Sequence, residues 1–452
     1  MNVIVAGSGK IGATLISALV DEGHDVVVID QNPDVIAEIT NIYDVMGVCG
    51  NCADSDILEE ARAKDAELII AVAGSDELNM LCCFLAKKMG AKHTIARIRN
   101  PEYNDKSLGF IKQNLELSMI INPELLAAHE LFNILKMPSA AKIETFSVRN
   151  LEMIEQILKP ESPLVDISLS DLRSKYKAKF LICSVQRGDE AYIPDGNFVL
   201  KSGDRIGLIA EQAEIIKLLK EMGIQPTRAK NVMILGGSHT AYYLAKKLAV
   251  SGSNVTIIER NREICDELCE ALPKATIING DGADQELLLE EGLNSVDAFV
   301  SLTGMDEENI LLSSFAYSKQ VPKVIAKVNR ESLIPLAEHW GLDTLISPKM
   351  IISDIILRYV RALQNSEGSS VETLYKLMDG KVEALEFSVK AESLLLNRSF
   401  KELNFKPNTL VAGIIRDRKI IIPSGEDCLK VNDKVIVLAA NQRLNKLSDI
   451  LK

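Results

Sequence analysis

The chain has 452 residues, of which 47% are hydrophobic and 25% are charged, and its formal net charge is -12. It is too long for one hydrophobic core, so about two to four domains are expected. The acidic balance and the lack of any long block of Lys or Arg argue against a nucleic-acid partner. No apolar run approaches the roughly 20 residues that span a bilayer. An apolar strand at the very start leaves no room for a signal peptide, so we expect a cytoplasmic protein.

Eight cysteines in a chain of this length do not make a disulfide framework. Cys49 and Cys52 form a C-x-x-C pair, which suits a redox or metal site or, as we favour, two small residues at a strand end and in a loop. No second C-x-x-C completes a four-thiolate zinc site, and the five histidines lack ligand spacing. No metal site is therefore predicted.

The first 138 residues alternate short apolar strands with segments of helical spacing. Strands are expected at 3–6, 25–29, 66–73 and 93–98, and the clearest helix at 11–20. Short, entirely apolar strands separated by helices indicate a parallel sheet that is covered on both faces. We therefore predict a Rossmann-like α/β fold for this part of the chain.

A glycine turn follows the first strand and opens the first helix, with the spacing Gly7-x-Gly9-x-x-Gly12. Gly7 allows a tight turn, Gly9 lets the backbone approach a pyrophosphate, and Gly12 lets the helix pack on the sheet. Asp30 ends the next strand, where a carboxylate accepts both ribose hydroxyls and repels a 2′-phosphate. This pattern predicts a site for NAD(H) or an adenine mononucleotide and excludes NADP(H).

Other residues of this first site come from the turn and from the ends of later strands. Asn51 and Cys52 are expected near the adenine, and Ala73 and Gly74 near the second ribose or the pyrophosphate. Arg97 suits bidentate phosphate binding, with a surface charge at a strand end as the alternative. The predicted first site comprises Gly7, Ser8, Gly9, Lys10, Ile11, Asp30, Asn51, Cys52, Ala73, Gly74 and Arg97.

The chain repeats itself at a nearly constant offset. Gly7 matches Gly236, and "GNCAD" at 50–54 matches "GDGAD" at 280–284. Each half therefore has a larger α/β module followed by a smaller one, whose short strands and turns indicate an α+β unit. We predict two Rossmann-like domains with parallel sheets, at 1–138 and 229–365, each followed by a small α+β domain, at 139–225 and 370–452.

The second glycine turn departs from the dinucleotide pattern. Ser238 replaces the middle glycine and adds a Cβ where the pyrophosphate must come close, whereas Glu259 keeps the ribose carboxylate. A different pose, a mononucleotide or no ligand are all open here. The candidate residues of the second site are Gly236, Gly237, Ser238, His239, Thr240 and Glu259.

Several stretches resemble a known family: "VAGSGKIG" at 5–12, "GNCADSDIL" at 50–58, "AVAGSDELNMLCC" at 71–83 and "ARIRNPEY" at 96–103. Over its whole length the chain resembles the peripheral proteins of Trk potassium uptake, which consist of two tandem regulator-of-K+-conductance (RCK) units. The resemblance implies a homo-oligomer, a tetramer forming a gating ring, at the inner face of the cell membrane. An integral membrane potassium channel or transporter subunit is the implied partner. NAD(H) is the implied ligand, with ATP or ADP as further ligands, bound by the residues named above.

The same resemblance implies two further features. The stretch "INPELLAAHELFNIL" at 121–135 is similar to the crossover helix that pairs lobes in this family. The small modules resemble a C-terminal unit that in some members binds cyclic dinucleotides at a dimer interface. A second regulatory surface is therefore a hypothesis for these modules.

The nucleotide is expected to be sensed without being consumed. A dehydrogenase presents an acid–base group to the nicotinamide, but residues 140–225 contain no histidine. A duplicated binding module suits an assembly in which ligands shift the positions of domains. We therefore predict no catalytic residue and no enzyme. A soluble NAD-dependent oxidoreductase and a nucleotide-sensing scaffold for a non-channel partner are the alternatives.

Overall fold

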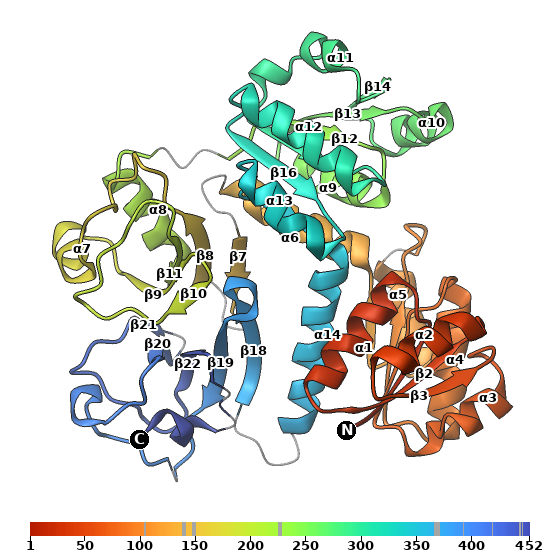
Figure 1. Cartoon of the computed structure of the whole chain (residues 1–452), viewed down its shortest axis with the longest axis horizontal. Coiled ribbons are helices and arrows are strands. Elements are labelled where there is room, and N and C mark those ends of the chain that lie inside the picture. The colour runs from red at the N-terminus through yellow and green to blue at the C-terminus, as the bar shows by residue number, and fades with distance from the viewer. Residues whose placement is uncertain are drawn as a thin grey trace.

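The computed structural model describes every residue except 104, 138–141, 147–150, 225–227, 366–370, 392, 418, 443 and 445. It contains four sheets, two of six strands and two of five. Figure 1 shows the four units that these sheets form, with the two smaller units side by side and the two larger ones joined by long helices. The predicted fold class is confirmed. The predicted boundaries at 138/139, 225 and 370 fall on residues outside the described part.

The first Rossmann-like domain has a fully parallel sheet in the order β3-β2-β1-β4-β5-β6. From β1 the chain adds strands toward one edge of the sheet, and from β4 it adds them toward the other edge. Ligands bind at such a switch point, outside the carboxyl ends of the strands. The strands are β1 (Asn2–Ala6), β2 (Asp25–Asp30), β3 (Met46–Cys49), β4 (Leu68–Ala71), β5 (His93–Arg97) and β6 (Met119–Ile121). The helices are α1 (Lys10–Asp21), α2 (Pro33–Ile42), α3 (Ser55–Glu60), α4 (Asp76–Met89), α5 (Asp105–Asn114) and α6 (Pro123–Lys136).

The second Rossmann-like domain repeats this design in the order β14-β13-β12-β15-β16-β17. Its strands are β12 (Asn231–Leu235), β13 (Asn254–Glu259), β14 (Thr276–Asn279), β15 (Ala298–Ser301), β16 (Lys323–Lys327) and β17 (Leu345–Ile346). Its helices are α9 (His239–Val250), α10 (Arg262–Ala271), α11 (Gln285–Glu290), α12 (Asp306–Ser318), α13 (Ile334–His339) and α14 (Pro348–Asn365).

Local signals place the helix starts at equivalent points of the two halves. The Asn32 side chain accepts a hydrogen bond from the Asp34 amide at 3.0 Å and begins α2, and Asn261 does the same for Glu263 at 2.8 Å and begins α10. A side-chain acceptor at this position satisfies one of the amides that an isolated helix end leaves without a partner. The repeat in sequence is therefore also a repeat in helix geometry.

The last helix of each Rossmann-like domain packs on the other domain. Ala127 and Leu131 of α6 are fully buried in one core with Val232 and Leu244 of the second domain. In the same way, α14 contributes Ile352, Ile356, Leu357 and Val360 to a core of the first domain. The stretch at 121–135 thus contains most of α6, a helix that crosses between lobes as the resemblance implied. This exchange makes each domain depend on the other for part of its core.

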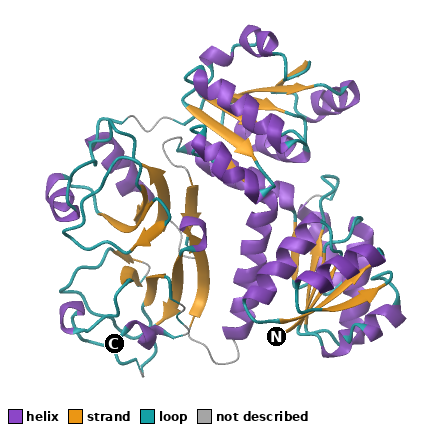
Figure 2. Cartoon of the chain, viewed as in Figure 1, coloured by secondary structure: helices purple, strands orange, loops and turns teal. Residues whose placement is uncertain are grey.

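The small domains contain antiparallel sheets in the orders β10-β9-β11-β8-β7 and β18-β19-β22-β20-β21 (Figure 2). Buried Met153 and Ile209 of the first sheet share a core with Leu377 and Ile436 of the second, so the two domains form a pair. The first has β7 (Lys142–Thr145), β8 (Leu151–Ile157), β9 (Phe180–Arg187), β10 (Glu190–Tyr192), β11 (Arg205–Glu211), α7 (Leu169–Lys175) and α8 (Gln212–Glu221). The second has β18 (Val371–Leu377), β19 (Val382–Ser388), β20 (Thr409–Arg416), β21 (Lys419–Ile421) and β22 (Lys434–Ala440).

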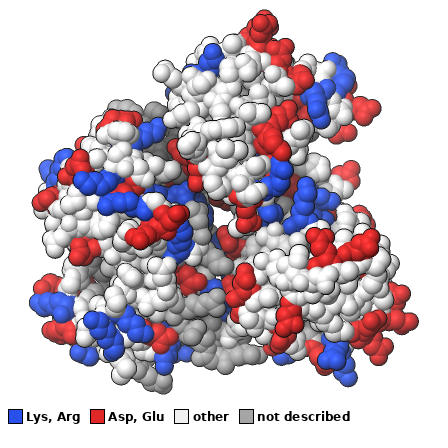
Figure 3. All heavy atoms as spheres, viewed as in Figure 1, with Lys and Arg blue, Asp and Glu red and all other residues white. Residues whose placement is uncertain are grey.

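Two surface properties bear on the partners of the protein. Among the described residues, no helix has both the length and the apolar character that crossing a membrane requires. Figure 3 shows Lys and Arg interspersed with Asp and Glu over the described residues of the face in view, without an extended basic patch. This mixture of charges differs from the basic footprint typical of nucleic-acid binding.

Candidate nucleotide site

A cavity of about 610 Å³ lies where the two Rossmann-like domains meet, and both contribute to its wall. The first residues of four helices, α1, α9, α6 and α14, line it. Helix N-termini present free amides and a positive dipole end, so four of them around one cavity favour an anionic ligand. The lining includes Gly7, Ser8, Gly9, Lys10, Ile11, Asp30, Cys52, Ala73, Gly74, Arg97, Glu124, Ser238, His239, Thr240, Lys327, Asn329 and Lys349.

The glycine turn at 7–12 has the geometry that its spacing predicts. Gly7 adopts a φ of +99°, and a Cβ there would lie 2.7 Å from the Ala73 backbone. A Cβ on Gly12 would lie 1.9 Å from the Gly7 carbonyl oxygen, because helix and turn are in direct contact. A Cβ on Gly9 would meet nothing within 4 Å. Since Gly9 also lines the cavity, this open space is available to a ligand.

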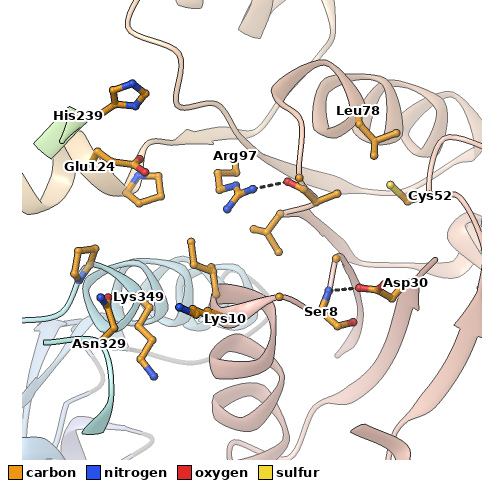
Figure 4. Close-up of a pocket in the computed structure, with 18 of the residues that line it drawn as sticks. Ser8, Lys10, Asp30, Cys52, Leu78, Arg97, Glu124, His239, Asn329 and Lys349 are labelled. Atoms are coloured by element: carbon orange, nitrogen blue, oxygen red, sulfur yellow. Dashed lines mark hydrogen bonds between the residues drawn. The ribbon is translucent and has the colours of Figure 1, made fainter. Parts of the chain in front are cut away.

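Asp30 is held at the floor of the cavity by the backbone. Its Oδ2 accepts a hydrogen bond from the Ser8 amide at 2.7 Å, and its Oδ1 accepts one from the Asn32 amide at 3.0 Å (Figure 4). Each carboxylate oxygen keeps capacity for a further hydrogen bond. The carboxylate is therefore oriented in advance and able to accept from a diol.

Basic side chains from both domains line the same cavity. Arg97 is 9% exposed, and its Nη2 donates to the Ala73 carbonyl (Figure 4). Lys327 occupies the equivalent place in the second domain and donates to the Leu302 carbonyl at 3.1 Å. Burial lowers the pKa of both groups. Because desolvation disfavours these cations, the phosphate groups of a ligand would stabilise their charged forms.

The cavity lining also includes two charged residues, Glu124 and Lys349, that the sequence patterns did not indicate. Glu124 and Lys349 are the second residues of α6 and α14, which are the two crossover helices, and both line the cavity (Figure 4). Each follows a Pro at the start of its helix, in "NPE" and "SPK". The repeated Pro indicates that Glu124 and Lys349 each lie in the first turn of a helix. Their position beside the first site, however, depends on the exchange of helices between the domains.

The structure groups most of the predicted site residues but not all of them. Ser238, His239 and Thr240 line the same cavity as the first site, so the two predicted sites are not separate pockets. Gly236, Gly237 and Glu259 are not in its lining. A Cβ on Gly237 would lie 2.8 Å from the Ile264 side chain, because this glycine is packed against α10. Asn51 is also outside the lining: it is exposed, and its side chain accepts from the Ala53 amide at 3.0 Å.

The second glycine turn keeps the carboxylate geometry but differs at its middle residue. Glu259 accepts from the Gly237 amide at 2.6 Å and from the Asn261 amide at 2.7 Å, as Asp30 does in the first half. The Ser238 hydroxyl accepts from the Ala241 amide at 3.4 Å and caps α9. This cap uses an amide that Gly9 leaves free in α1, where no side chain caps the helix. The second turn is therefore a poorer anion site than the first.

The cysteines form no metal site within the described residues, since no group of three His, Cys, Asp or Glu side chains could hold an ion. All eight cysteines are free. Cys49 is exposed, whereas Cys52 is buried in the cavity wall. The interpretation of the C-x-x-C pair as small residues at a strand end and in a loop agrees with these positions.

A second cleft, of about 460 Å³, lies between the two small domains. The turns at 194–196 and 423–425, which are equivalent in the repeat, lie on its walls together with the side chains of Phe180, Phe400 and Phe405. Arg173 from the first domain and Lys401 from the second add one cation each. The cleft thus combines aromatic side chains with two cations and one carboxylate, Asp195.

The fold and the cavity define a class of protein: a tandem pair of Rossmann-like domains with exchanged helices, each followed by a small antiparallel domain. Two family models match the chain twice each. The TrkA-N domain matches residues 3–123 and 232–348, and the TrkA-C domain matches residues 153–223 and 384–452. The chain belongs to the Trk potassium-uptake family defined by these two domains.

Known relatives extend over the full chain. A Trk system potassium uptake protein TrkA homolog of Archaeoglobus fulgidus is 29% identical over 453 residues, which cover 100% of both chains. A homolog from Methanosarcina mazei is 30% identical over 413 residues, covering 90% of this chain and 99% of its own. The Trk system potassium uptake protein TrkA of Vibrio alginolyticus is 28% identical, covering 98% and 96%.

Solved structures share the fold. The GsuK RCK domain superposes with a TM-score of 0.64 at 17% identity, covering 97% of this chain and 92% of that one. The GsuK channel bound to NAD gives a TM-score of 0.64 at 16% identity, covering 97% and 77%. The RCK architecture that the sequence resemblance implied is confirmed.

Proposed function

We propose that this chain is the nucleotide-sensing regulatory subunit of a potassium uptake system. NAD(H), and also ATP or ADP, binds in the cavity between the Rossmann-like domains, and an integral membrane potassium channel or transporter subunit receives the resulting change of shape. The protein is then peripheral at the inner face of the cell membrane. Relatives named as Trk potassium uptake proteins and RCK-type neighbours, one of them a channel bound to NAD, support this role.

One observation carries the proposal: the cavity has walls from both halves of the chain. A ligand held by Asp30 and the glycine turn at 7–12 also meets His239, Lys327 and Lys349 of the second half. Its free energy of binding therefore depends on how the two domains are placed. A ligand with different affinity for two arrangements shifts their populations, and a difference of about 1–3 kcal/mol changes them about 5- to 150-fold.

The ring-shaped homo-oligomer implied by the resemblance has support from exposed apolar side chains at equivalent places. Leu81 on α4 is 47% exposed and Leu311 on α12 is 57% exposed. Phe110 on α5 and Trp340 after α13 are exposed on the neighbouring elements. Exposed apolar side chains at equivalent places of the two halves suit contacts between protein subunits. We propose that these helices join copies of the chain into a tetramer.

Nucleotide binding is expected to change the shape of the purified protein without consuming the ligand. Small-angle scattering with saturating NADH, ATP or ADP should show a changed radius of gyration or assembly, while the absorbance of NADH stays constant over hours. With the membrane subunit in liposomes, the same nucleotides should alter potassium flux. Steady oxidation of NADH by the protein alone, lost in Asp30→Ala, would instead establish the oxidoreductase. A shape response with no effect on any channel subunit would favour the sensing scaffold.

A cyclic dinucleotide is a second proposed ligand, and the cleft between the small domains favours it. Its walls come from equivalent turns of the repeat, and this approximate two-fold arrangement matches a ligand of two identical halves. Phenylalanines offer stacking and Arg173 and Lys401 offer charge. Calorimetry with cyclic di-AMP should show one molecule bound per chain and weaker binding in Arg173→Met. No heat of binding would remove this proposal while leaving the nucleotide cavity unaffected.

A further inference from the structure

The helix that starts at the nucleotide cavity ends at a buried ion cluster. α1 begins at Lys10, directly after the glycine turn, and Glu22 follows its last residue. Its 12 residues span about 18 Å at 1.5 Å per residue. Rigid secondary-structure elements can carry energetic coupling between the sites at their two ends. α1 thus links the glycine turn to Glu22 directly along the chain.

Glu22 is clamped by an arginine from the other half of the chain. Arg361 of α14 donates from Nε at 2.8 Å and from Nη2 at 2.7 Å to the two oxygens of Glu22. The Glu22 side chain is 7% exposed and the Arg361 side chain 17%. A bidentate pair with this little solvent holds its partners in one geometry. The end of α1 and the crossover helix α14 are therefore joined.

The same arginine reaches a small domain. Its Nη2 lies 3.6 Å from Oε1 of Glu383, on β19 of the second small domain, where the Glu383 side chain is 16% exposed. Figure 1 shows α14 between α1 on one side and β18 and β19 on the other, and α14 contacts both α1 and β18. Two carboxylates keep the pKa of the Arg361 guanidinium raised in spite of its burial. Three domains thus meet at one cation.

The other half of the repeat has a different chemistry at the equivalent places. Ser251 corresponds to Glu22 at the end of α9, and its hydroxyl donates to the Leu248 carbonyl of its own helix. Lys136 corresponds to Arg361 and lies over the Phe132 ring at 4.5 Å. The charge of Lys136 acts on Glu152 of β8 in the first small domain, but Ser251 offers it no carboxylate at the end of α9. Of these two helices, only α1, which follows the complete glycine pattern, is followed by a carboxylate that a crossover helix holds.

We propose that the Glu22–Arg361–Glu383 cluster is the connection through which occupancy of the first nucleotide site reaches the paired small domains. The proposal rests on the proposed function, since it needs a nucleotide at the glycine turn. Arg361 is a positioning residue: it is not in the lining of the nucleotide cavity, and it couples α1 to β19. Because coupling is reciprocal, the state of the small domains also affects the affinity of the first site.

Hydrogen–deuterium exchange on the full-length protein tests this connection. In the wild type, saturating NADH should slow exchange at 7–11 and change exchange over 382–388 at least about 5-fold. In Glu383→Gln, which leaves the Glu22–Arg361 pair intact, the change at 382–388 should disappear while the protection at 7–11 remains. Glu383→Asp keeps the charge and should restore part of the response. Glu426→Gln is the matched control, because it removes an exposed ion pair with Lys401 in the same small domain.

The outcomes separate the proposals. A response at 382–388 that persists in Glu383→Gln, or is lost equally in Glu426→Gln, overturns the connection. Protection at 7–11 without any change at 382–388 in the wild type also overturns it, although nucleotide binding then stands. A wild type with no protection at 7–11 removes both the nucleotide proposal and the connection. If Glu383→Gln lowers the melting temperature strongly, Arg361→Lys provides the same comparison, since lysine keeps the charge but not the bidentate geometry.

Discussion

Gly9→Val and Asp30→Ala should each weaken NADH binding by at least about 100-fold. A valine at Gly9 places a branched side chain in the open space beside the cavity, where the pyrophosphate is expected. Removing the Asp30 carboxylate takes away two charge-assisted hydrogen bonds to the ribose, each worth about 1.5–3 kcal/mol. Isothermal titration calorimetry should show one NADH per chain in the wild type and no measurable binding in either variant.

Gly9→Val separates an effect on ligand binding from an effect on folding. Gly9 has a φ of -63°, which any residue adopts, and its Cβ position is free of protein atoms, so the fold should tolerate the change. Gly12→Val is unsuitable, because the new side chain would collide with the Gly7 carbonyl. Glu259→Ala is the matched control for Asp30→Ala: it removes the equivalent carboxylate outside the cavity lining and should leave the affinity unchanged. Wild-type affinity in Gly9→Val or Asp30→Ala, with normal circular dichroism, would refute the assignment of this site.

Leu131→Ala should lower the free energy of unfolding of the second Rossmann-like domain by about 3 kcal/mol. Leu131 lies on α6 of the first half and is fully buried against Val232 and Leu244 of the second domain. Truncating a leucine in such a core costs about 2–5 kcal/mol through lost burial and the cavity left behind. Trp340 is the single tryptophan and lies in the second domain after α13. Its fluorescence during urea unfolding therefore reports the stability of that domain.

A surface leucine provides the comparison. Leu394 of the second small domain is 68% exposed and lies outside the proposed subunit contact, and Leu394→Ala should change the free energy of unfolding by no more than about 0.5 kcal/mol. If α6 were not part of the second domain's core, Leu131→Ala would leave the Trp340 transition at the wild-type urea concentration. That result would contradict the exchange of crossover helices.

Much of the first nucleotide site was predictable because its signals are local. The glycine turn, the strand before it and Asp30 after the next strand all lie within 30 residues, and the backbone geometry of a parallel sheet brings them together. The adenine contact of Asn51 stays a prediction: its side chain accepts from the Ala53 amide, and it is not in the cavity lining. The signal for an Asx turn and the signal for an adenine contact look the same in sequence.

The sequence by itself determined the fold of each module, the repeat and the residues of the first glycine turn, because apolar period, turn glycines and helix caps act over a few residues. Only the tertiary structure decided which residues of the two halves contact each other. The exchange of α6 and α14 and the joining of Ser238, His239 and Thr240 to the first site arise from packing between domains. Gly237 is kept out of the cavity by packing against α10 within its own domain. Packing between domains also brings Arg361 to Glu22, across 339 residues of chain. Contacts over such separations depend on which apolar faces bury each other, and no local pattern records that choice.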